Sequence, residues 1–334
     1  MNQNIIYKRL SYIWRNTFLK WYRSMKNKRI ERYWHEHKKC LGKENLDKTF
    51  YIIRRRDKYP GIFSYVITTL AHIDKEIKMG RIPIIDMQNN FNIYLNPEQV
   101  GKENAWEFYF EQPYNIGLDD IKKSRNVIIG SGDIPQLFPY LDVKFLQGKT
   151  GEIEYWRKLS HKYIRLNRTT EERLKKIRKE LFGEKERILG VLGRGTDYTA
   201  KRPANHPVQP NPEELLEKAK DIFEKEKCTK IFLATEDKNI YNLFKSAVGD
   251  ILITYHGEFL DYKGGLIGKE GYINNKDRKE SGFNYLAEIY LLSKCQCLCA
   301  GRTSGTVGAL LFTEGYDYMY LFDLGIYGRD DNDK

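Results

Sequence analysis

The hydrophobic positions of this chain fall into two kinds of run. Short continuous apolar runs predict buried strands, and we place them at residues 51–53, 82–86, 127–129, 187–192, 230–235, 251–254, 297–300 and 318–322. Runs with a three-to-four residue period predict amphipathic helices, at residues 63–73, 213–226, 239–248, 283–293 and 306–312. Strands that alternate with helices in this order form βαβ units and parallel sheets. The pattern therefore predicts an α/β fold.

A long helical segment without strands separates these elements into two groups. It covers residues 154–184, where apolar and aromatic side chains recur at helical spacing. A chain of 334 residues has room for about two domains. We therefore expect a Rossmann-like N-terminal domain over residues 46–180 and a doubly wound C-terminal domain over residues 181–334.

Residues 1–45 form a third part, which we expect to be a basic amphipathic helical arm. Residues 1–40 contain eleven Lys and Arg against two acidic residues, so they carry +9 of the chain's net charge of +12. The apolar positions share one helical face, namely Ile6, Leu10, Ile13, Trp14, Phe18, Trp21, Tyr22 and Met25. A basic helix with Trp suits an anionic membrane surface. The alternatives are a helix packed on the protein's own surface and a nucleic-acid-binding segment, and no reader motif supports the latter.

The cysteines and the apolar runs limit the class of protein. Five cysteines without regular pairing argue against a disulfide framework and favour the reducing cytoplasm. Cys295, Cys297 and Cys299 alternate as in a strand, so we expect all three to be buried on one face. No cluster has the spacing of a zinc site, and we expect no metal. No apolar run of 18 residues predicts a membrane span, and no N-terminal apolar stretch predicts a secretory signal.

Four residues of the N-terminal domain are candidates for the acceptor side of a cleft. Asp57 and Gly61 follow the first strand, at the edge where α/β sheets place ligands. Trp106 and Glu111 belong to the segment 104–113, which combines aromatic rings with carboxylates and amides. Such groups can stack on a sugar ring and hydrogen-bond it. The alternative is an aromatic-rich helix that packs on the sheet.

Three polar clusters follow strands of the C-terminal domain, namely Gly193–Asp197, Glu236–Asp237 and Gly301–Gly305. Because the carboxyl ends of parallel strands lie at one edge of a sheet, the clusters should converge. The last cluster opens a helix, whose free amides and hydroxyls suit a diphosphate. Arg194 stands between two glycines, so it can approach a phosphate closely and neutralise it. The sequence therefore predicts a nucleotide-type anion site.

In these clusters the chain resembles the fucosyltransferase superfamily that includes α1,6-fucosyltransferases, rhizobial nodulation fucosyltransferases and protein O-fucosyltransferases. The resemblance covers about residues 185–328, and more loosely residues 50–135. The family's His-Val-Arg-Arg-Thr-Asp motif, with His-Pro about nine residues later, corresponds to Leu192–Asp197 followed by His206-Pro207. Its Ala-Thr-Asp-Asp motif corresponds to Ala234–Asp237, and its Thr/Ser-rich helix start corresponds to Thr303–Gly305.

The resemblance implies a GT-B fold, in which two Rossmann-like domains face a central cleft, and a metal-independent, inverting transfer from GDP-fucose. Arg194 would bind the β-phosphate and stabilise the departing GDP, with Asp197 as the second catalytic residue. Glu288 would read guanine, because a carboxylate accepts from N1–H and N2–H₂ together. Thr303 and Ser304 would hold phosphate. The other donor-binding residues would be Gly193, Gly195, His206, Glu236, Asp237 and Gly305.

The chain departs from the family pattern at three positions. Leu192 stands in place of the motif His, and Gly195 in place of the second Arg. Arg202 stands where the α1,6-transferases have a glutamate proposed as base. The base is therefore unassigned, with the candidates Asp57, Glu111, Asp197 and His206.

We expect a bacterial glycosyltransferase that builds a surface glycan such as a capsule or a lipopolysaccharide. It would be cytoplasmic, and the arm would hold it on the inner face of the plasma membrane. Its partners would be a nucleotide sugar and a glycan acceptor, and not nucleic acid. One alternative is a GT-B transferase with another donor, including an α1,2-fucosyltransferase. The segment Arg194–Tyr198 resembles the Arg-Gly-Asp-Tyr loop of those enzymes. The other is a non-catalytic nucleotide- or glycan-binding protein.

Overall fold

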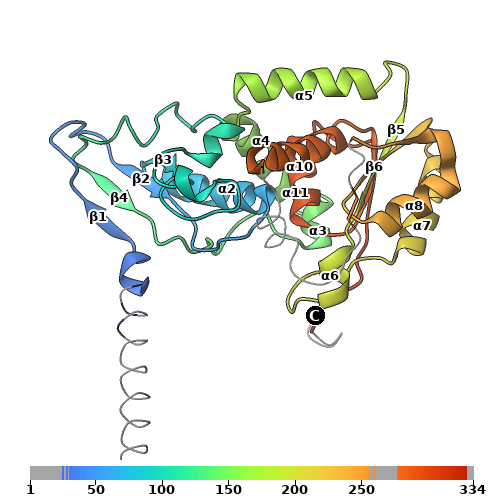
Figure 1. The fold of residues 1–334 in the computed structure, drawn as a ribbon, viewed down its shortest axis with the longest axis horizontal. Coiled ribbons are helices and arrows are strands. Elements are labelled where there is room, and N and C mark those ends of the chain that lie inside the picture. Colours follow the sequence, from blue (N-terminus) through green and yellow to red (C-terminus); the bar gives the residue numbers. More distant parts are fainter. Residues whose placement is uncertain (1–24, 26–27, 29, 256–258, 261–276, 329–334) are drawn as a thin grey trace, which may run out of the picture.

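The computed structural model describes residues 25, 28, 30–255, 259–260 and 277–328. Most of the predicted arm, including its apolar face at residues 6–22, lies outside this part of the chain. Within it, two α/β units form around two separate sheets (Figure 1). Among the described helices, none is both long enough and apolar enough to cross a bilayer.

The N-terminal sheet has the strand order β1-β4-β2-β3. β2 (Phe50–Ile53) pairs in parallel with β3 (Ile82–Ile85) and with β4 (Val127–Ile129). α2 (Ile62–Lys78) connects β2 to β3 and is buried along most of its length. The predicted βαβ unit is therefore present.

The fourth strand of this sheet corrects the expected extent of the arm. β1 (His37–Lys39) pairs antiparallel with β4, with Lys38 opposite Ile128. Its three residues are all exposed, so the sequence has no apolar run that marks it as a strand. The N-terminal domain therefore begins before residue 46, and residues 37–39 belong to its sheet.

The C-terminal sheet is entirely parallel, in the order β7-β6-β5-β8-β9. Its strands are β5 (Ile188–Gly193), β6 (Lys230–Thr235), β7 (Leu252–Ile253), β8 (Cys297–Ala300) and β9 (Tyr318–Leu321). The order turns back at β5, because β6 lies on one side of it and β8 on the other. Ligands of doubly wound sheets bind at such a switch point, beyond the carboxyl ends of the strands.

Two helical layers cover this sheet, and the alternation of side chains along β5 explains them. Leu189 and Val191 face α7 (Pro212–Lys225) and α8 (Lys238–Val248), whereas Ile188 and Leu192 belong to the core with α10 (Arg278–Leu292) and α11 (Ser304–Phe312). Asn211 begins α7 with a capping box to Glu214, as its sequence predicts.

The three clustered cysteines are buried, but they do not share one face. Cys297 and Cys299 lie in β8 and pack in the cluster that includes α7, whereas Cys295 precedes the strand and packs in the other layer. The expected alternation fails at Cys295 because the strand begins two residues later, at Cys297.

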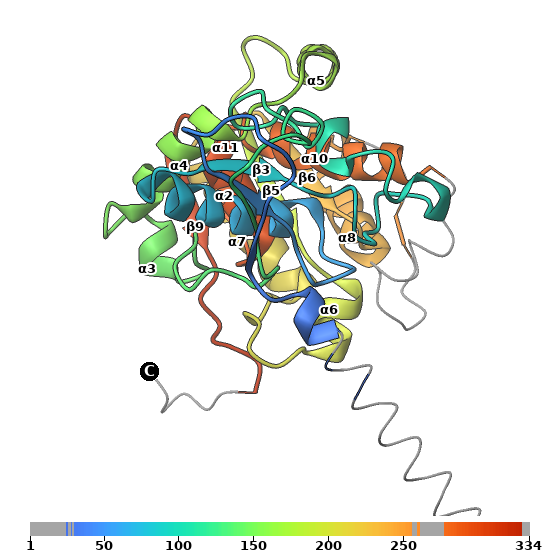
Figure 2. The same cartoon turned by 90° about the vertical axis from the view of Figure 1, so that its left-hand side faces the viewer.

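The connection between the two sheets is helical, with α3 (Val143–Leu146), α4 (Glu152–Tyr163) and α5 (Arg168–Leu181) in succession. α4 and α2 both contact α11, so one hydrophobic core runs from the N-terminal unit into the C-terminal one (Figures 1 and 2). At the crossing of α2 and α11 the backbones approach closely. A Cβ atom on Gly308 would lie 2.6 Å from Cε1 of Phe63, which has no exposed surface.

Short helical turns complete the described chain: η1 (Pro97–Gln99), η2 (Ala105–Phe108), α6 (Thr196–Lys201) and η3 (Gly249–Ile251). α6 begins directly after Gly195, where the sequence pattern predicts only a loop.

Candidate functional site

The loops that follow β5 and β8 flank the switch point of the C-terminal sheet. Arg194 is the first residue after β5, and Thr303 is the N-cap of α11 after β8. β6, the neighbour of β5, ends at Thr235 and places Glu236 and Asp237 at the same edge. The three predicted clusters therefore converge, as their positions in the topology require.

Arg194 forms an ion pair with Glu236, through Nη1 and Oε1. Its guanidinium also lies 5.6 Å from the ring centroid of Tyr198. About a quarter of each side chain of the ion pair is exposed, 27% for Arg194 and 26% for Glu236. The pair is thus accessible to a ligand. An anion that binds Arg194 would either displace the Glu236 carboxylate or bind the guanidinium together with it.

The backbone at Thr196 adopts a conformation that β-branched residues rarely take. Its φ is +56°, in the left-handed region, which costs of the order of 1–3 kcal/mol. Hydrogen bonds hold it there: its amide donates to Asp237 Oδ2 at 2.9 Å, and its hydroxyl donates to Glu236 Oε1 at 3.0 Å. The loop that carries Arg194 is therefore fixed by the two carboxylates that follow β6.

Asp237 is a positioning residue. One carboxylate oxygen accepts the amides of Asn239 and Ile240 at the start of α8, and the other accepts Thr196. The structure thus gives Asp237 a role in supporting the loop, and its contact with the donor stays a prediction.

The two glycines beside Arg194 have different roles. A Cβ atom on Gly195 would lie 2.6 Å from Cγ of Asp237, so only glycine permits this close approach. A Cβ atom on Gly193 would lie 3.0 Å from Cγ2 of Ile240 and 3.1 Å from Cδ2 of Leu215, which belong to the helices behind the sheet. The side of Gly193 where a Cβ atom would lie therefore packs against α7 and α8, and its contact with the donor stays a prediction.

The N-terminus of α11 is formed as the sequence predicts. The hydroxyl of Thr303 accepts the amide of Thr306 at 3.1 Å, and the Thr306 hydroxyl bonds to the carbonyl of Gly301 at 2.5 Å. Ser304 begins the helix, and the first amides of a helix have no partner within it. These amides, with the partial positive charge of the helix end, suit a phosphate.

The arginine of this segment, Arg302, faces away from the helix N-terminus. It is buried, donates to the carbonyls of Leu141 and Gly325 at 3.3 and 3.0 Å, and pairs with Asp323 at 2.9 Å. Arg302 thereby holds the segments around residues 141 and 323–325 against the loop that follows β8.

Glu288 lies on α10, and 8% of the residue is exposed. Burial, and next the negative charge of Glu236, raise the pKa of Glu288 well above its ordinary value. Tyr285, one helical turn before it, interacts electrostatically with Arg194, Glu236 and Glu288. Glu288 is thus near enough to Glu236 to feel its charge, and burial makes its own negative charge costly.

Tyr285 is the residue of this site that the sequence interpretation missed. A Cβ atom on Gly305 would lie 2.8 Å from its hydroxyl oxygen, and one on Gly61 would lie 3.6 Å from its ring. Tyr285 therefore joins α10, the start of α11 and the start of α2. The available signal was its position three residues before Glu288, because residues three apart share a helical face.

The N-terminal unit contributes Gly61 to this group, but its other candidates lie elsewhere. Trp106 has no exposed surface, packs against Phe110 with the rings tilted and 4.5 Å between their centroids, and donates to the Glu111 carbonyl at 3.0 Å. Its predicted contact with a sugar is therefore wrong, and the packing alternative holds. The Glu111 carboxylate pairs with Arg165 at 3.1 Å, beside the connecting helices.

The remaining candidates lie at the margins of the site. Asp57 is exposed and pairs with Arg55 at 3.3 Å. His206 is exposed, and its ring lies edge-on to the Tyr198 ring with 5.5 Å between the centroids. Tyr198 therefore lies between His206 and Arg194. The backbone of Asp197 lies in α6, but its side chain falls outside what the structure describes.

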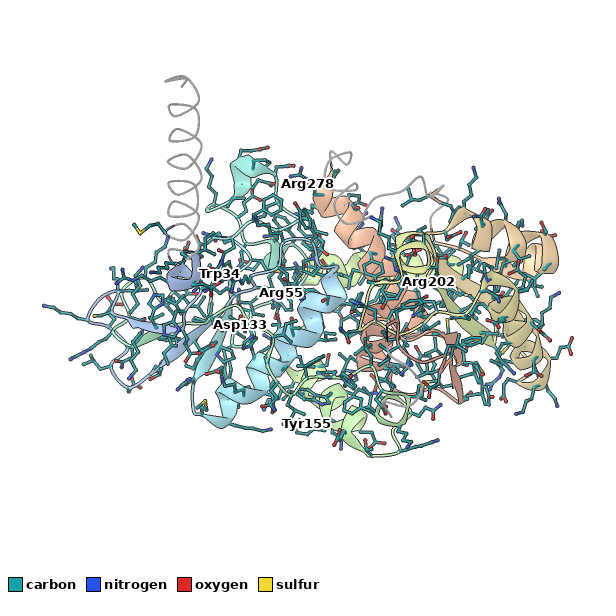
Figure 3. All side chains as sticks on the ribbon, turned by 90° about the horizontal axis from the view of Figure 1, so that it is seen from below. Trp34, Arg55, Asp133, Tyr155, Arg202 and Arg278 are labelled. Atoms are coloured by element: carbon teal, nitrogen blue, oxygen red, sulfur yellow. The ribbon has the colours of Figure 1, made fainter. Side chains whose placement is uncertain are left out.

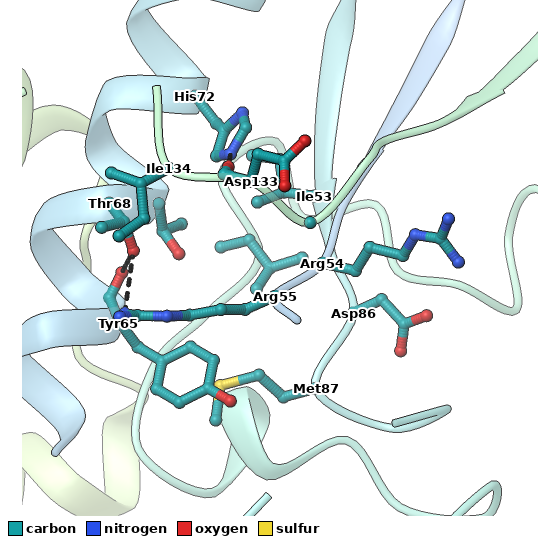
Figure 4. Close-up of a pocket in the computed structure, with 13 residues that line it drawn as sticks. Ile53, Arg54, Arg55, Tyr65, Thr68, His72, Asp86, Met87, Asp133 and Ile134 are labelled. Carbon is teal, nitrogen blue, oxygen red and sulfur yellow. Dashed lines mark hydrogen bonds between the residues drawn. The ribbon is translucent and has the colours of Figure 1, made fainter. Parts of the chain in front are cut away.

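A small pocket opens at the carboxyl edge of the N-terminal sheet (Figure 4). Arg55 crosses it, donating to the carbonyl of Ser64 at 2.7 Å and to the hydroxyl of Thr68 at 3.3 Å. His72 borders it and donates from Nε2 to the carbonyl of Asp133 at 2.9 Å. Burial lowers the pKa of His72 to about 4, so this imidazole is neutral near pH 7.

Comparison with solved structures bears on the fold of the chain. No model of a known protein family and no curated protein matches the chain. A crystal structure of the α-1,6-fucosyltransferase NodZ soaked with GDP-fucose aligns with 84% of this chain and 97% of its own, with a TM-score of 0.50 and 18% identity. The chain has the GT-B fold.

Two further structures have lower TM-scores. A crystal structure of the fucosyltransferase NodZ from Bradyrhizobium covers 80% of this chain and 93% of its own, with 18% identity and a TM-score of 0.46. An apo-form of POFUT1 covers 84% of this chain and 99% of its own, with 10% identity and a TM-score of 0.47. At these identities the likeness concerns the fold.

Proposed function

We propose that this protein is a glycosyltransferase that binds a nucleotide sugar at the carboxyl edge of its C-terminal sheet. The observation that carries the proposal is the pairing of Arg194 with Glu236 opposite the N-terminus of α11, at the switch point of the sheet. A guanidinium and a helix N-terminus on two sides of one edge suit a diphosphate.

We infer that the donor is GDP-fucose. Glu288 supports guanine, because a buried carboxylate is stabilised when it accepts two hydrogen bonds from N1–H and N2–H₂. The fold supports fucose only by likeness, since the NodZ structure with the same fold was soaked with GDP-fucose.

The chemistry that follows is an inverting displacement without a metal. An acceptor hydroxyl attacks the anomeric carbon, the bond from that carbon to the β-phosphate oxygen breaks, and the electron pair leaves with GDP. Arg194 stabilises the negative charge on that phosphate as it develops, and Ser304 and the first amides of α11 hold the diphosphate. Arg194 exchanges Glu236 for phosphate in this step, and the hydroxyl proton passes to a base that stays unassigned.

The acceptor side is the N-terminal unit, which reaches the site through Gly61 and carries the pocket beside Arg55. We propose that the acceptor is a precursor of a bacterial surface glycan, such as a capsule or a lipopolysaccharide. The basic residues of 1–40 would hold the enzyme on the cytoplasmic face of the plasma membrane.

The test combines binding with turnover. A thermal-shift screen with GDP, UDP, CMP and dTDP identifies the base, because a ligand of the native state raises the melting temperature. Hydrolysis or transfer is then measured with a panel of nucleotide sugars. Arg194→Ala should lower kcat by about 10²–10³-fold at an unchanged melting temperature. Lys201→Ala removes a neighbouring exposed positive charge and should leave kcat unchanged.

Two outcomes would contradict the proposal. Near-normal kcat in Arg194→Ala would remove this residue from the reaction. Nucleotide binding without turnover of any donor would favour a non-catalytic binding protein.

A second candidate is a GT-B transferase that uses another nucleotide, and Leu192 favours it. Where the fucosyltransferase motif has a polar His, Leu192 is 7% exposed and lies near Gly305. A thermal shift with UDP, CMP or dTDP that exceeds the shift with GDP would select this candidate.

A further inference from the structure

The chain between β4 and α3 exposes a group of apolar side chains, of which Ile134 also borders the pocket beside Arg55. Ile134 is 48% exposed, Leu137 65% and Tyr140 48%. We call residues 134–140 the apolar loop; Pro135 and Pro139 restrict its backbone. Contiguous exposed apolar side chains on a soluble surface mark an interaction site.

The apolar loop is continuous with the base of the N-terminal arm. Just before it, a Cβ atom on Gly132 would lie 2.6 Å from the Trp34 ring, so the loop starts directly against residues 30–35. Trp34 and Asp133 border one hollow of about 370 Å³, together with Arg32, His35 and Arg56. Figure 3 shows Trp34 and Asp133 side by side when the molecule is seen from below.

Residues 1–29 hold eight Lys and Arg and no acidic residue, and this segment joins the chain at residue 30, beside the apolar loop. The described residues around the hollow are mixed in charge, since Arg56 pairs with Glu31 and Asp133 is acidic. A basic segment is therefore attached to the chain next to the apolar loop. In Figure 1, residues 30–35 and the chain between β4 and α3 lie along the lower side of the N-terminal unit.

The other end of the apolar loop is tied to the candidate donor site. The carbonyl of Leu141 accepts Nη1 of Arg302 at 3.3 Å, and Arg302 directly precedes Thr303, the N-cap of α11. The residue that follows the apolar loop is therefore tied to the loop between β8 and α11.

We propose that the apolar loop is a second membrane contact, which inserts Ile134, Leu137 and Tyr140 into the headgroup region of an anionic bilayer beside the arm. Aliphatic side chains and an aromatic ring with a polar end suit that depth, and positive charge adjacent to them attracts anionic lipid. The partner is the lipid surface, and the docking orients the candidate site toward an acceptor held in the membrane.

Insertion is measured with a polarity-sensitive dye on the intact chain. Cys40 is exposed, and the other four cysteines are buried, so Cys40→Ser with Leu137→Cys gives one accessible thiol. Vesicles of phosphatidylcholine with phosphatidylglycerol should shift the dye emission to the blue, and phosphatidylcholine alone should shift it much less. Leu46→Cys in the same Cys40→Ser background is the control, because Leu46 is 62% exposed and precedes β2 at the opposite edge of the sheet.

Co-sedimentation with the same vesicles gives an independent measure. The triple variant Ile134→Ser, Leu137→Ser and Tyr140→Ser should bind at least about tenfold more weakly. The matched control Leu46→Ser with Met79→Ser should bind as the natural chain does, since Met79 is 54% exposed and also lies at the opposite edge. A dye at residue 137 that stays in water, or equal binding by the triple variant, overturns the proposal. Neither assay contains a donor, so the result is independent of the proposed transfer.

Discussion

The substitution Gly195→Ala tests whether the loop after β5 must follow its observed path. The added methyl group would lie 2.6 Å from Cγ and 2.8 Å from Cβ of Asp237, and closer still to its Oδ2. Real Cβ atoms do not approach so closely, and Asp237 is fixed by its bonds to Asn239 and Ile240. The loop must therefore move away from Asp237.

That movement has two measurable costs. The hydrogen bond from the Thr196 amide to Asp237 is lost, and the overpacked contact adds strain, so the free energy of unfolding should fall by about 1–3 kcal/mol. Arg194, one residue before, shifts with the loop, and a misplacement of about 1 Å lowers kcat by about 10²-fold. The effect on kcat should therefore exceed what the modest loss of stability would produce.

The assay compares kcat with thermal unfolding for Gly195→Ala and for a matched control. Gly117→Ala is that control, because its Cβ atom would meet only ordinary contacts, the nearest at 3.5 Å from Glu107 Oε1. The control should behave as the natural chain does. If Gly195→Ala also keeps its kcat and its melting temperature, the close approach to Asp237 does not position Arg194 and the reasoning is refuted.

Two further predictions concern the guanine site and the crossing of the two units. The raised pKa of Glu288 keeps its carboxyl protonated in the free protein below that pKa, whereas guanine requires the carboxylate. GDP affinity, measured by calorimetry, should therefore fall as pH falls, by up to tenfold per pH unit. Glu288→Gln should reduce the difference in affinity between GDP and UDP, which has no guanine. A pH profile that is the same for Glu288→Gln and the natural chain would contradict this. Gly308→Ala should lower the free energy of unfolding by about 1–3 kcal/mol, because the added methyl group would clash with Phe63, which Tyr285 and Phe312 hold in place. Phe63→Leu in the same chain should restore part of that free energy. Additive effects of the two changes would contradict the contact between them.

The local pattern of the sequence was sufficient for most elements of both sheets. Continuous apolar runs marked β2 and β6 because both faces of these strands are buried, and the cap at Asn211 marked the start of α7 because its side chain bonds within three residues. The convergence of Arg194 and Glu236 was also predictable, since parallel strands bring their carboxyl ends to one edge.

Tertiary structure decided the features that depend on residues far apart in the chain. β1 is exposed and polar, so only its pairing with β4 makes it a strand. Trp106 belongs to a segment whose composition is typical of a sugar-binding site, but η2 packs on the core, so this ring is buried and does not reach a ligand. The left-handed Thr196 and the short helix that follows exist because Asp237, 41 positions later, holds its amide.

The sequence by itself determined most strands and helices and the sheet edge that carries Arg194, Glu236 and Thr303, because periodicity and capping act over a few residues. Only the tertiary structure assigned roles within that edge. It separated Arg194, which reaches the surface, from Gly195 and Asp237, which support the loop, and it added Tyr285 at the junction of the two units. Those roles depend on contacts between distant segments, and a local pattern does not encode such contacts.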